Sequence, residues 1–307
     1  MPQVKLYPDI HFLIGTIAES DLETVMCPIC KSLNMSIIHI LTPFRVVLCK
    51  DCSLIYLNPR LIESVIRRVY QGKDYFVQGG DTGYRDYLTQ ENSLRITFRR
   101  FLEELRKNGM TSGRLLEVGC GYGYFLDEAR NFFSYRAGIE LSEEAGSHAQ
   151  RLSGAEIHIG SVGLLPPEFK NFTIIVIINV IEHIYNPIKF LLFLKQRLLR
   201  GGTIFIATPD IGSFWYRIMK SKWPSFKIPE HVAFYTERTL KMLLQKSGFH
   251  NVHRVPFHHA FPLGLIAGKF GMNIQGRLGQ IPVWIPKTMI ALSAQNLAQY
   301  AILDNRE

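Results

Sequence analysis

Short runs of mostly apolar residues alternate with helical segments from residue 114 onward. The runs are bounded by turn residues and read RLLEVG from residue 114, RAGIEL from 136, EIHIG from 156, FTIIVIIN from 172 and GTIFIAT from 202. Strands that are apolar on both sides are typical of a parallel sheet that helices cover on both faces. We therefore predict a doubly wound α/β sheet as the core of residues 109–307.

The helices around these strands have clear capping residues. Asn186 is a good N-cap, Pro187 suits the first turn that follows, and Gly201 is the expected exit of that helix. A second helix is expected from Thr236 to Gly248. These signals predict one helix before and one helix after the fifth apolar run in the sequence.

The N-terminal third of the chain lacks this alternation. Residues 1–60 combine a poorly patterned start with two short strands, VVLC and LIYL, and residues 61–108 look helical. The apolar spacing in FRRFLEELRKNG gives the last helix a buried face, and Gly109 is its expected end. We predict three segments: an N-terminal module to residue 60, a helical linker to 108 and the α/β domain to 307.

Length, composition and charge narrow the class of protein. The 307 residues are 47% hydrophobic, which suits one large core with a small additional module. The formal net charge is +9, but no run of five basic residues concentrates it. No apolar run reaches the roughly 18 residues of a membrane-spanning helix, and no secretory leader pattern opens the chain. We expect a cytoplasmic protein without a transmembrane segment.

Four cysteines form the clearest metal-binding pattern. Cys27 and Cys30 make one C-x2-C pair and Cys49 and Cys52 make another, a spacing typical of a tetrahedral zinc site with four thiolates. Two disulfides are the alternative, and the expected reducing compartment disfavours them. Four protein ligands leave no open position on the ion, so the zinc is predicted to be structural.

A glycine-rich turn follows the first strand of the α/β domain. Glu117 precedes Gly119, Gly121 and Gly123, whereas the dinucleotide fingerprint G-x-G-x-x-G would need glycine where Tyr124 stands. An acid at the end of the strand repels a pyrophosphate and suits a cationic amine. The turn therefore favours a cofactor that carries an ammonium group.

The sequence EVGCGYG resembles the first motif of class I S-adenosylmethionine (SAM) dependent methyltransferases, and NVIEHIYNP continues the resemblance after the fourth strand. The resemblance covers about residues 110 to 255 and implies a seven-stranded, Rossmann-like sheet. It places Glu140 on the ribose and Ser161 near the adenine, where family members often have aspartate. The implied cofactor-binding residues are Glu117, Gly119, Gly121, Gly123, Glu140, Ser161, Asn179 and Val180. The segment IPKTMIALSA is then expected to be the last, antiparallel strand, at the sheet edge.

The cysteine module together with SLIYLNPR is similar to zinc-headed methyltransferases that act on sugars, secondary metabolites or envelope glycoconjugates. In the sugar-modifying members a Glu-His pair follows the fifth strand, and here Glu230 and His231 occupy that place. The aromatic and basic residues between strand and pair could line an acceptor pocket or pack as a lid: Trp215, Tyr216, Lys220, Lys222 and Trp223. The apolar residues 256–285 could contact a lipid-linked acceptor or a partner subunit.

Histidine is the expected general base, because its ordinary pKa lies near neutrality. His231, supported by Glu230, and His183 are the candidates; alternatively, Glu230 and His231 brace the lid, and Glu182 with His183 caps a helix. A zinc-containing RNA methyltransferase is a second possibility, although NVIEH differs from the N/D-P-P-Y/F motif of base methylation. A catalytically degenerate protein that binds SAM or only a partner is a third.

Overall fold

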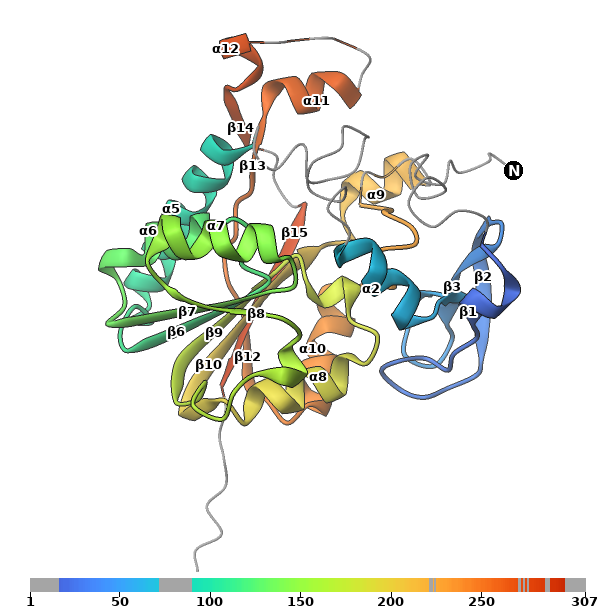
Figure 1. The fold of residues 1–307 in the computed structure, drawn as a ribbon. Helices are drawn as coiled ribbons and strands as arrows, with labels where there is room; N and C mark the ends of the chain where they lie inside the picture. Colours follow the sequence, from blue (N-terminus) through green and yellow to red (C-terminus); the bar gives the residue numbers. More distant parts are fainter. Residues whose placement is uncertain are drawn as a thin grey trace, which may run out of the picture.

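The computed structural model describes residues 17–71, 90–220, 223, 225–269, 272, 274, 276–284 and 288–295. Its largest sheet has seven strands in the order β12-β15-β10-β9-β6-β7-β8 (Figure 1). These strands are β6 (Arg114–Val118), β7 (Tyr135–Glu140), β8 (Glu156–Ile159), β9 (Phe172–Ile178), β10 (Leu198–Pro209), β12 (His250–Arg254) and β15 (Met289–Gln295). The five strands from β10 to β8 are parallel, which confirms the predicted doubly wound fold.

The position of the last strand differs from the prediction. Strand β15 is antiparallel, as expected, but it pairs with β10 on one side and with β12 on the other. It is therefore the second strand from the edge. The edge strand β12 has the sequence HNVHR, whose polar residues gave no strand signal.

Helices cover both faces of this sheet. One face carries α5 (Glu91–Lys107), α6 (Tyr124–Glu128) and α7 (Glu143–Ser153), and the other carries α8 (Pro187–Lys195) and α10 (Glu237–Lys246) (Figure 1). Neighbouring residues of β6 point to opposite faces: Leu115 belongs to the core with Phe101, and Leu116 to the core with Leu191. Burying an apolar side chain of this size contributes about 1.5 to 3 kcal/mol, so the double apolar pattern selects a sheet covered on both faces.

The predicted helix starts are confirmed, and one predicted end is wrong. The side chain of Asn186 accepts a hydrogen bond from the Lys189 backbone N–H at 3.3 Å, and Pro187 begins α8. Helix α8 ends at Lys195, whereas Gly201 lies inside β10 with φ 75°. The reason is that β10 begins early, at Leu198, and contains an irregularity in its pairing with β9 that the glycine accommodates.

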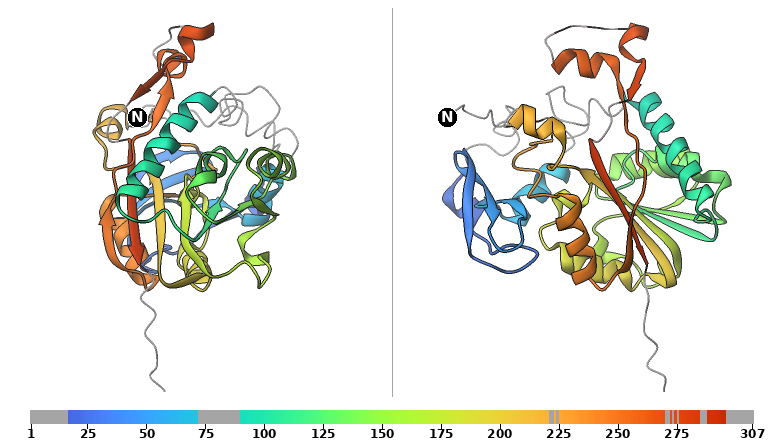
Figure 2. Two further views of the ribbon diagram at one scale, coloured as in Figure 1. Left: turned by 90° about the vertical axis from the view of Figure 1, so that its left-hand side faces the viewer. Right: turned by 180° about the vertical axis from the view of Figure 1, so that it is seen from behind.

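A second sheet of four strands lies beside the first, in the order β11-β4-β3-β2 (Figure 2). Its strands are β2 (Met35–Leu41), β3 (Phe44–Cys49), β4 (Ile55–Leu57) and β11 (Ala233–Phe234). Strands β3 and β4 correspond to the predicted VVLC and LIYL. Strand β11 comes from the α/β half of the chain, so the N-terminal module shares a sheet with the domain that follows it. The sequence did not predict this connection.

The remaining elements are short or lie at the periphery. They are η1 (Glu19–Asp21), β1 (Leu22–Glu23), β5 (Arg60–Leu61), α2 (Glu63–Gln71), η2 (Ala129–Asn131), η3 (Val162–Leu164), η4 (Ile181–His183), α9 (Phe214–Met219), β13 (Ala260–Pro262), α11 (Leu263–Lys269), α12 (Gly276–Gly279) and β14 (Pro282–Trp284). The β13–β14 hairpin with α11 and α12 projects from one end of the molecule (Figure 1). Within the described ranges, every helix is too short or too polar to cross a membrane.

Candidate functional site

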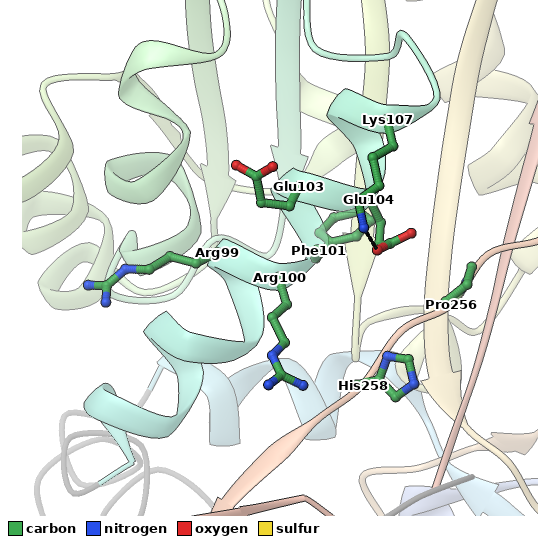
Figure 3. A pocket seen from close by; sticks show the side chains of 8 residues that line it. All are labelled: Arg99, Arg100, Phe101, Glu103, Glu104, Lys107, Pro256 and His258. Atoms are coloured by element: carbon green, nitrogen blue, oxygen red, sulfur yellow. Dashed lines mark hydrogen bonds and ion pairs between the residues drawn. The ribbon is translucent and has the colours of Figure 1, made fainter.

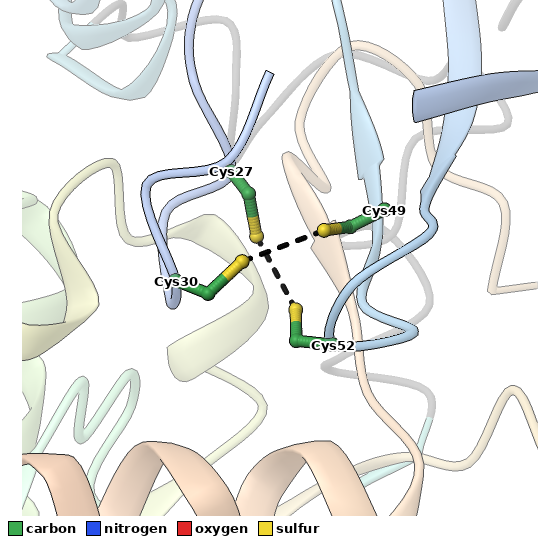
Figure 4. A group of neighbouring side chains, drawn as sticks. All are labelled: Cys27, Cys30, Cys49 and Cys52. Atoms are coloured by element: carbon green, nitrogen blue, oxygen red, sulfur yellow. Dashed lines mark hydrogen bonds between the residues drawn. The ribbon is translucent and has the colours of Figure 1, made fainter. Parts of the chain in front are cut away.

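The four cysteines converge on one point (Figure 4). The Cys27 and Cys52 sulfurs are 3.4 Å apart, the Cys30 and Cys49 sulfurs are 3.5 Å apart, and all four lie within 4.8 Å of one another. All four are free thiols. Tetrahedral zinc–sulfur bonds of about 2.3 Å would space the sulfurs about 3.8 Å apart, so the geometry fits one four-coordinate zinc ion.

Each cysteine pair lies in a tight turn of the same kind. The Cys27 backbone N–H donates to the carbonyl of Ser32, and the Cys49 backbone N–H donates to the carbonyl of Leu54. The residue after each second cysteine, Lys31 or Ser53, has a left-handed backbone, with φ of 63° and 67°. This conformation turns the chain so that two thiols of one pair face the same point.

The glycine turn follows β6 at the carboxyl end of the parallel strands. Gly119, Gly121 and Gly123 have φ of 73°, 52° and 82°, values that residues with a Cβ rarely adopt. A Cβ on Gly119 would lie 2.5 Å from the side chain of Val180, and one on Gly123 would lie 2.8 Å from the Ala149 backbone. The turn therefore brings the backbone close to two neighbouring segments, and only glycine fits.

Two buried carboxylates lie at this turn. Oε2 of Glu117 has no hydrogen-bond partner within the described part of the chain. Glu140 accepts from the backbone N–H groups of Gly121 at 2.9 Å, Leu141 at 2.8 Å and Ser142 at 3.0 Å. Burial, and then the charge of Glu140, raise the pKa of Glu117 well above its ordinary value. A buried acid with an unused oxygen suits a cationic group of a ligand.

The other predicted cofactor residues lie on adjoining strand ends. Asn179 has φ 54°, and its N–H donates to Ala207 of β10 at 2.9 Å. Val180 follows it and contacts the glycine turn. Ser161 is the N-cap residue just before η3, and the preceding Gly160 N–H donates to the Glu140 carbonyl at 2.8 Å. The ends of β6, β7, β8 and β9 thus meet at one edge, where ligands of such sheets bind.

Two histidines meet beside this edge. The rings of His183 and His231 are 4.6 Å apart between centroids and nearly perpendicular. Glu182 joins them, since one ligand atom from each of the three residues lies within 4.8 Å of the others. Glu182 accepts from the Thr208 hydroxyl at 2.8 Å through Oε2, and within the described chain its Oε1 has no hydrogen-bond partner. The three side chains could bind a proton. They could also bind a divalent cation, since three protein ligands leave one coordination position of the ion open.

Burial controls the ionisation of this cluster. It lowers the pKa of His183 to about 3 and that of His231 well below its ordinary value, and it raises the pKa of Glu182 to about 7. His183 is hydrogen-bonded to the Glu230 backbone and His231 to the Ser225 backbone. Each contact raises the histidine pKa and so opposes part of the larger effect of burial.

The structure thus adds Glu182 to the two histidines that the sequence singled out. The sequence placed the supporting acid at Glu230, which is buried and whose backbone contacts His183. Glu182 had been considered only as a helix cap. The missed signal is its position, directly before His183 in the short η4 helix that follows the mostly apolar strand β9.

The aromatic residues before the histidine pair form a packed cluster. Tyr216 of α9, Trp223 and Phe226 contact one another edge to face, with ring centroids 5.6 to 5.7 Å apart. Trp223 is 5% exposed. This packing fits a lid; Lys222, also named as a pocket residue, lies outside the described residues.

A separate surface hollow of about 390 Å³ lies between α5 and residues 256–258 (Figure 3). Its cations already have partners: Arg99 pairs with Glu128, Lys107 pairs with Glu104 of the same hollow, and Arg100 lies 3.9 Å from the Trp284 ring centroid. None of the predicted cofactor or histidine residues lines this hollow. It is not part of the site.

The sheet order, the glycine turn and its two buried acids define a class I SAM-dependent methyltransferase. Residues 89–254 match the methyltransferase domain family, which is more than half of the chain. The chain belongs to this family.

Individual relatives are distant. A probable SAM-dependent methyltransferase of Mycolicibacterium smegmatis is 25% identical, over 52% of this chain and 61% of its own length. A ubiquinone biosynthesis O-methyltransferase of Vibrio cholerae is 25% identical, over 58% of this chain and 78% of its own. The magnesium protoporphyrin IX methyltransferase of Synechocystis, solved with bound SAH, has the same fold, with TM-score 0.50, 12% identity and coverage of 76% of this chain and 99% of its own.

Proposed function

We propose that this methyltransferase transfers a methyl group from SAM to a small-molecule, sugar or lipid-linked acceptor, with His231 as the general base. The observation that carries the proposal is the close grouping of the His183 and His231 rings with the Glu182 carboxyl group at the carboxyl end of the parallel strands, where Glu182 and His231 are buried. A relative that acts in ubiquinone biosynthesis supports a small acceptor. The cluster favours an acceptor that must lose a proton, such as a hydroxyl group or an acidic carbon.

When bound, SAM supplies a methyl group on a positively charged sulfur. The chain's own residues must bind the donor, align the acceptor and remove its proton. The turn from Glu117 to Gly123 would hold the methionine end, with the Glu117 carboxylate on the ammonium group. Glu140 is oriented by three backbone N–H groups and would hold the ribose, and Ser161 would be on the adenine side.

His231 has the properties of a base that is ready to accept a proton. Burial lowers its pKa well below the ordinary value and so keeps the ring neutral at neutral pH, and a neutral imidazole has one unprotonated nitrogen that can accept a proton. Burial also makes His231 a weak base. When the nearby Glu182 is ionised, its negative charge stabilises the imidazolium that forms and so offsets this weakness. His183 lies next to His231 and orients it from the cofactor side.

We also propose that Cys27, Cys30, Cys49 and Cys52 bind one structural zinc ion. The convergent thiols and the two matching turns support this assignment. The ion would be closed to acceptors, since four thiolates fill its coordination shell. Methylation therefore relies on the histidine cluster.

The experiment combines labelled SAM with a panel of phenols, sugars, nucleotide sugars and lipid extracts, with transfer RNA as a separate probe. Once an acceptor is found, His231→Ala should lower kcat by about 10² to 10⁴, the usual effect of losing a general base, and leave SAM binding intact. His253→Ala, on the edge strand β12, is the matched control. Normal turnover by His231→Ala would refute the base. Salt-sensitive methylation of RNA would favour the RNA alternative, and SAM binding without any transfer would favour a degenerate protein.

A further inference from the structure

We propose that the four-cysteine module positions the two histidines of the acceptor site, because three of its segments contact the three segments that fix His183 and His231. The module is then a structural part of the acceptor site. It is required for the arrangement of the two histidines and is not required for SAM binding. This inference rests on the proposed function of the histidine cluster. Its evidence is a set of contacts between parts of the chain that are far apart in sequence.

The first contact fixes the segment of His231. Strand β11 pairs with β4 of the module, Ala233 opposite Tyr56 and Phe234 opposite Ile55. The Leu57 N–H donates to the carbonyl of Val232 at 3.0 Å. On its other side, the Val232 N–H donates to the Glu182 carbonyl at 2.9 Å. The residue after His231 is therefore bound between the module and the loop that carries Glu182 and His183.

This strand is directly connected to the cysteine cluster. Strand β3 ends at Cys49, strand β4 begins just after Cys52, and the two pair with Leu48 opposite Ile55. The turn that joins them is thus one of the two metal-binding turns. An ion on Cys49 and Cys52 would fix this turn, the register of β4 and, through β4, the register of β11.

The second contact fixes the segment of His183. The guanidinium group of Arg60 donates to the Tyr185 carbonyl at 3.2 Å and lies 4.1 Å from the Tyr185 ring centroid. Its Nε forms an ion pair with Glu23 at 2.8 Å. The Tyr185 hydroxyl in turn donates to the Leu61 carbonyl at 2.8 Å. Arg60 is nearly buried, so these contacts are shielded from water.

The third contact reaches the lid. The His39 ring of β2 lies 5.3 Å from the Phe226 ring and 3.3 Å, through Nε2, from the Tyr216 hydroxyl. Phe226 follows Ser225, whose backbone is hydrogen-bonded to the His231 ring. The module therefore contacts the backbone just after His231, the ring of Phe226 before it, and Tyr185 two residues beyond His183. An independent zinc module would not need contacts at all three places.

The test measures how well the histidines are protected, so it needs no known acceptor. Purified full-length protein with saturating SAH would be treated with diethyl pyrocarbonate, which modifies accessible imidazoles, and the rate at His183 and His231 would be followed by mass spectrometry. Hydrogen exchange of peptides covering 181–185 and 228–235 gives a second readout. Calorimetric titration with SAH reports the cofactor site.

The variants compare buried and exposed arginines of the same region. Arg60→Met keeps an apolar stem of similar length and removes the contacts to Tyr185 and Glu23. Arg67→Met removes an exposed pair with Glu63 and is the matched control. If Arg60→Met does not fold, Tyr185→Phe removes only the hydrogen bond to Leu61. Removal of bound metal by a chelator tests the link through Cys49 and Cys52.

We expect Arg60→Met to increase histidine modification about tenfold, as expected for the loss of a charged hydrogen bond. Metal removal should also increase it, because the register of β4 and β11 is then no longer fixed by Cys49 and Cys52. Exchange should rise in 181–185 and 228–235, with little change in 115–140 or in SAH affinity. Arg67→Met should behave as the native protein. Unchanged protection in Arg60→Met, or an equal loss across the whole chain, would overturn the inference. The proposed function is tested by a different result: it would be refuted if His231→Ala retained normal turnover, whatever the protection experiment shows.

Discussion

The proposed cofactor site and the proposed acceptor site lie at the same edge of the large sheet, but their residues come from very different stretches of chain. Glu117, the three glycines and Glu140 belong to one continuous unit, from β6 through the turn to β7. His183 and His231 lie after different strands, and their supports come from Arg60, Leu57 and Ser225. Local geometry forms the first site, whereas the second depends on contacts between distant segments. The two sites should therefore fail under different perturbations.

The largest expected effect on the acceptor side follows from removing the metal that we propose for the four-cysteine module. Cys52→Ser should remove about one zinc per chain and destabilise the module by several kcal/mol, because binding of structural zinc contributes directly to folding. Cys120→Ser is the matched control, since Cys120 is a buried free thiol outside the cluster. Elemental analysis and thermal unfolding measure both effects. Metal-free native protein with two disulfides would contradict the assignment. If the native protein holds a second equivalent of metal and His183→Ala loses it, then the cluster of Glu182, His183 and His231 binds a metal and does not act as a general base.

Glu182 should make the stability of the acceptor site depend on pH. Burial raises its pKa from 4.5 to about 7 in the folded chain, so the folded state holds this proton more tightly than the unfolded state. Its contribution is present below about pH 4.5 and is lost as pH rises through about 7. Relative to Glu182→Gln, native protein should lose about 3 kcal/mol of unfolding free energy over this window. Denaturant titrations at several pH values, with exposed Glu168→Gln as control, test this. If the difference in unfolding free energy between the native protein and Glu182→Gln stays constant across this pH range, the prediction is wrong.

On the cofactor side, Gly119→Ala should lower SAM affinity about a hundredfold, equivalent to about 2.7 kcal/mol. The new Cβ would lie 2.5 Å from the Val180 side chain, in a backbone with φ 73°. Gly154→Ala is a close control, since Gly154 has φ 66° and open space around it. Calorimetry should show normal SAM binding by the control. Equal losses in both variants would mean that backbone strain alone matters.

The smallest effect is expected at the ribose side. Glu140→Ala removes charged hydrogen bonds to the ligand and to the turn, which together contribute on the order of 1.5 to 3 kcal/mol. Exposed Glu143→Ala, in the first turn of α7, should leave affinity unchanged. The histidine protection of Glu140→Ala should also remain native. Loss of that protection would show that the two sites are not independent.

The same contrast explains which features the sequence predicted. The apolar strands, the caps at Asn186 and Thr236 and the turn after Glu117 are encoded within short windows, and the structure has them. The edge strand β12 is polar and depends on β15 for its pairing, so it gave no periodic signal. The pairing of β11 with β4 depends on residues that are far apart in the sequence.

The candidate site divides in the same way. The cysteines and the glycine turn were found by spacing, because a metal or a close backbone approach demands fixed residue types. Arg60 was visible only as part of SLIYLNPR, and nothing in the sequence pointed to its contact with Tyr185. The support of His231 by Ser225 uses a backbone carbonyl, which no residue pattern reveals.

Calorimetric titration of the native protein with SAM and, separately, with NAD tests the central claim most directly. The Glu117 oxygen that has no hydrogen-bond partner in the described chain, and the Glu140 carboxylate that three backbone N–H groups hold, predict saturable binding of SAM that Gly119→Ala weakens about a hundredfold. No binding of NAD is expected, because Tyr124 stands where the dinucleotide fingerprint requires glycine. Binding of NAD without binding of SAM would contradict the account.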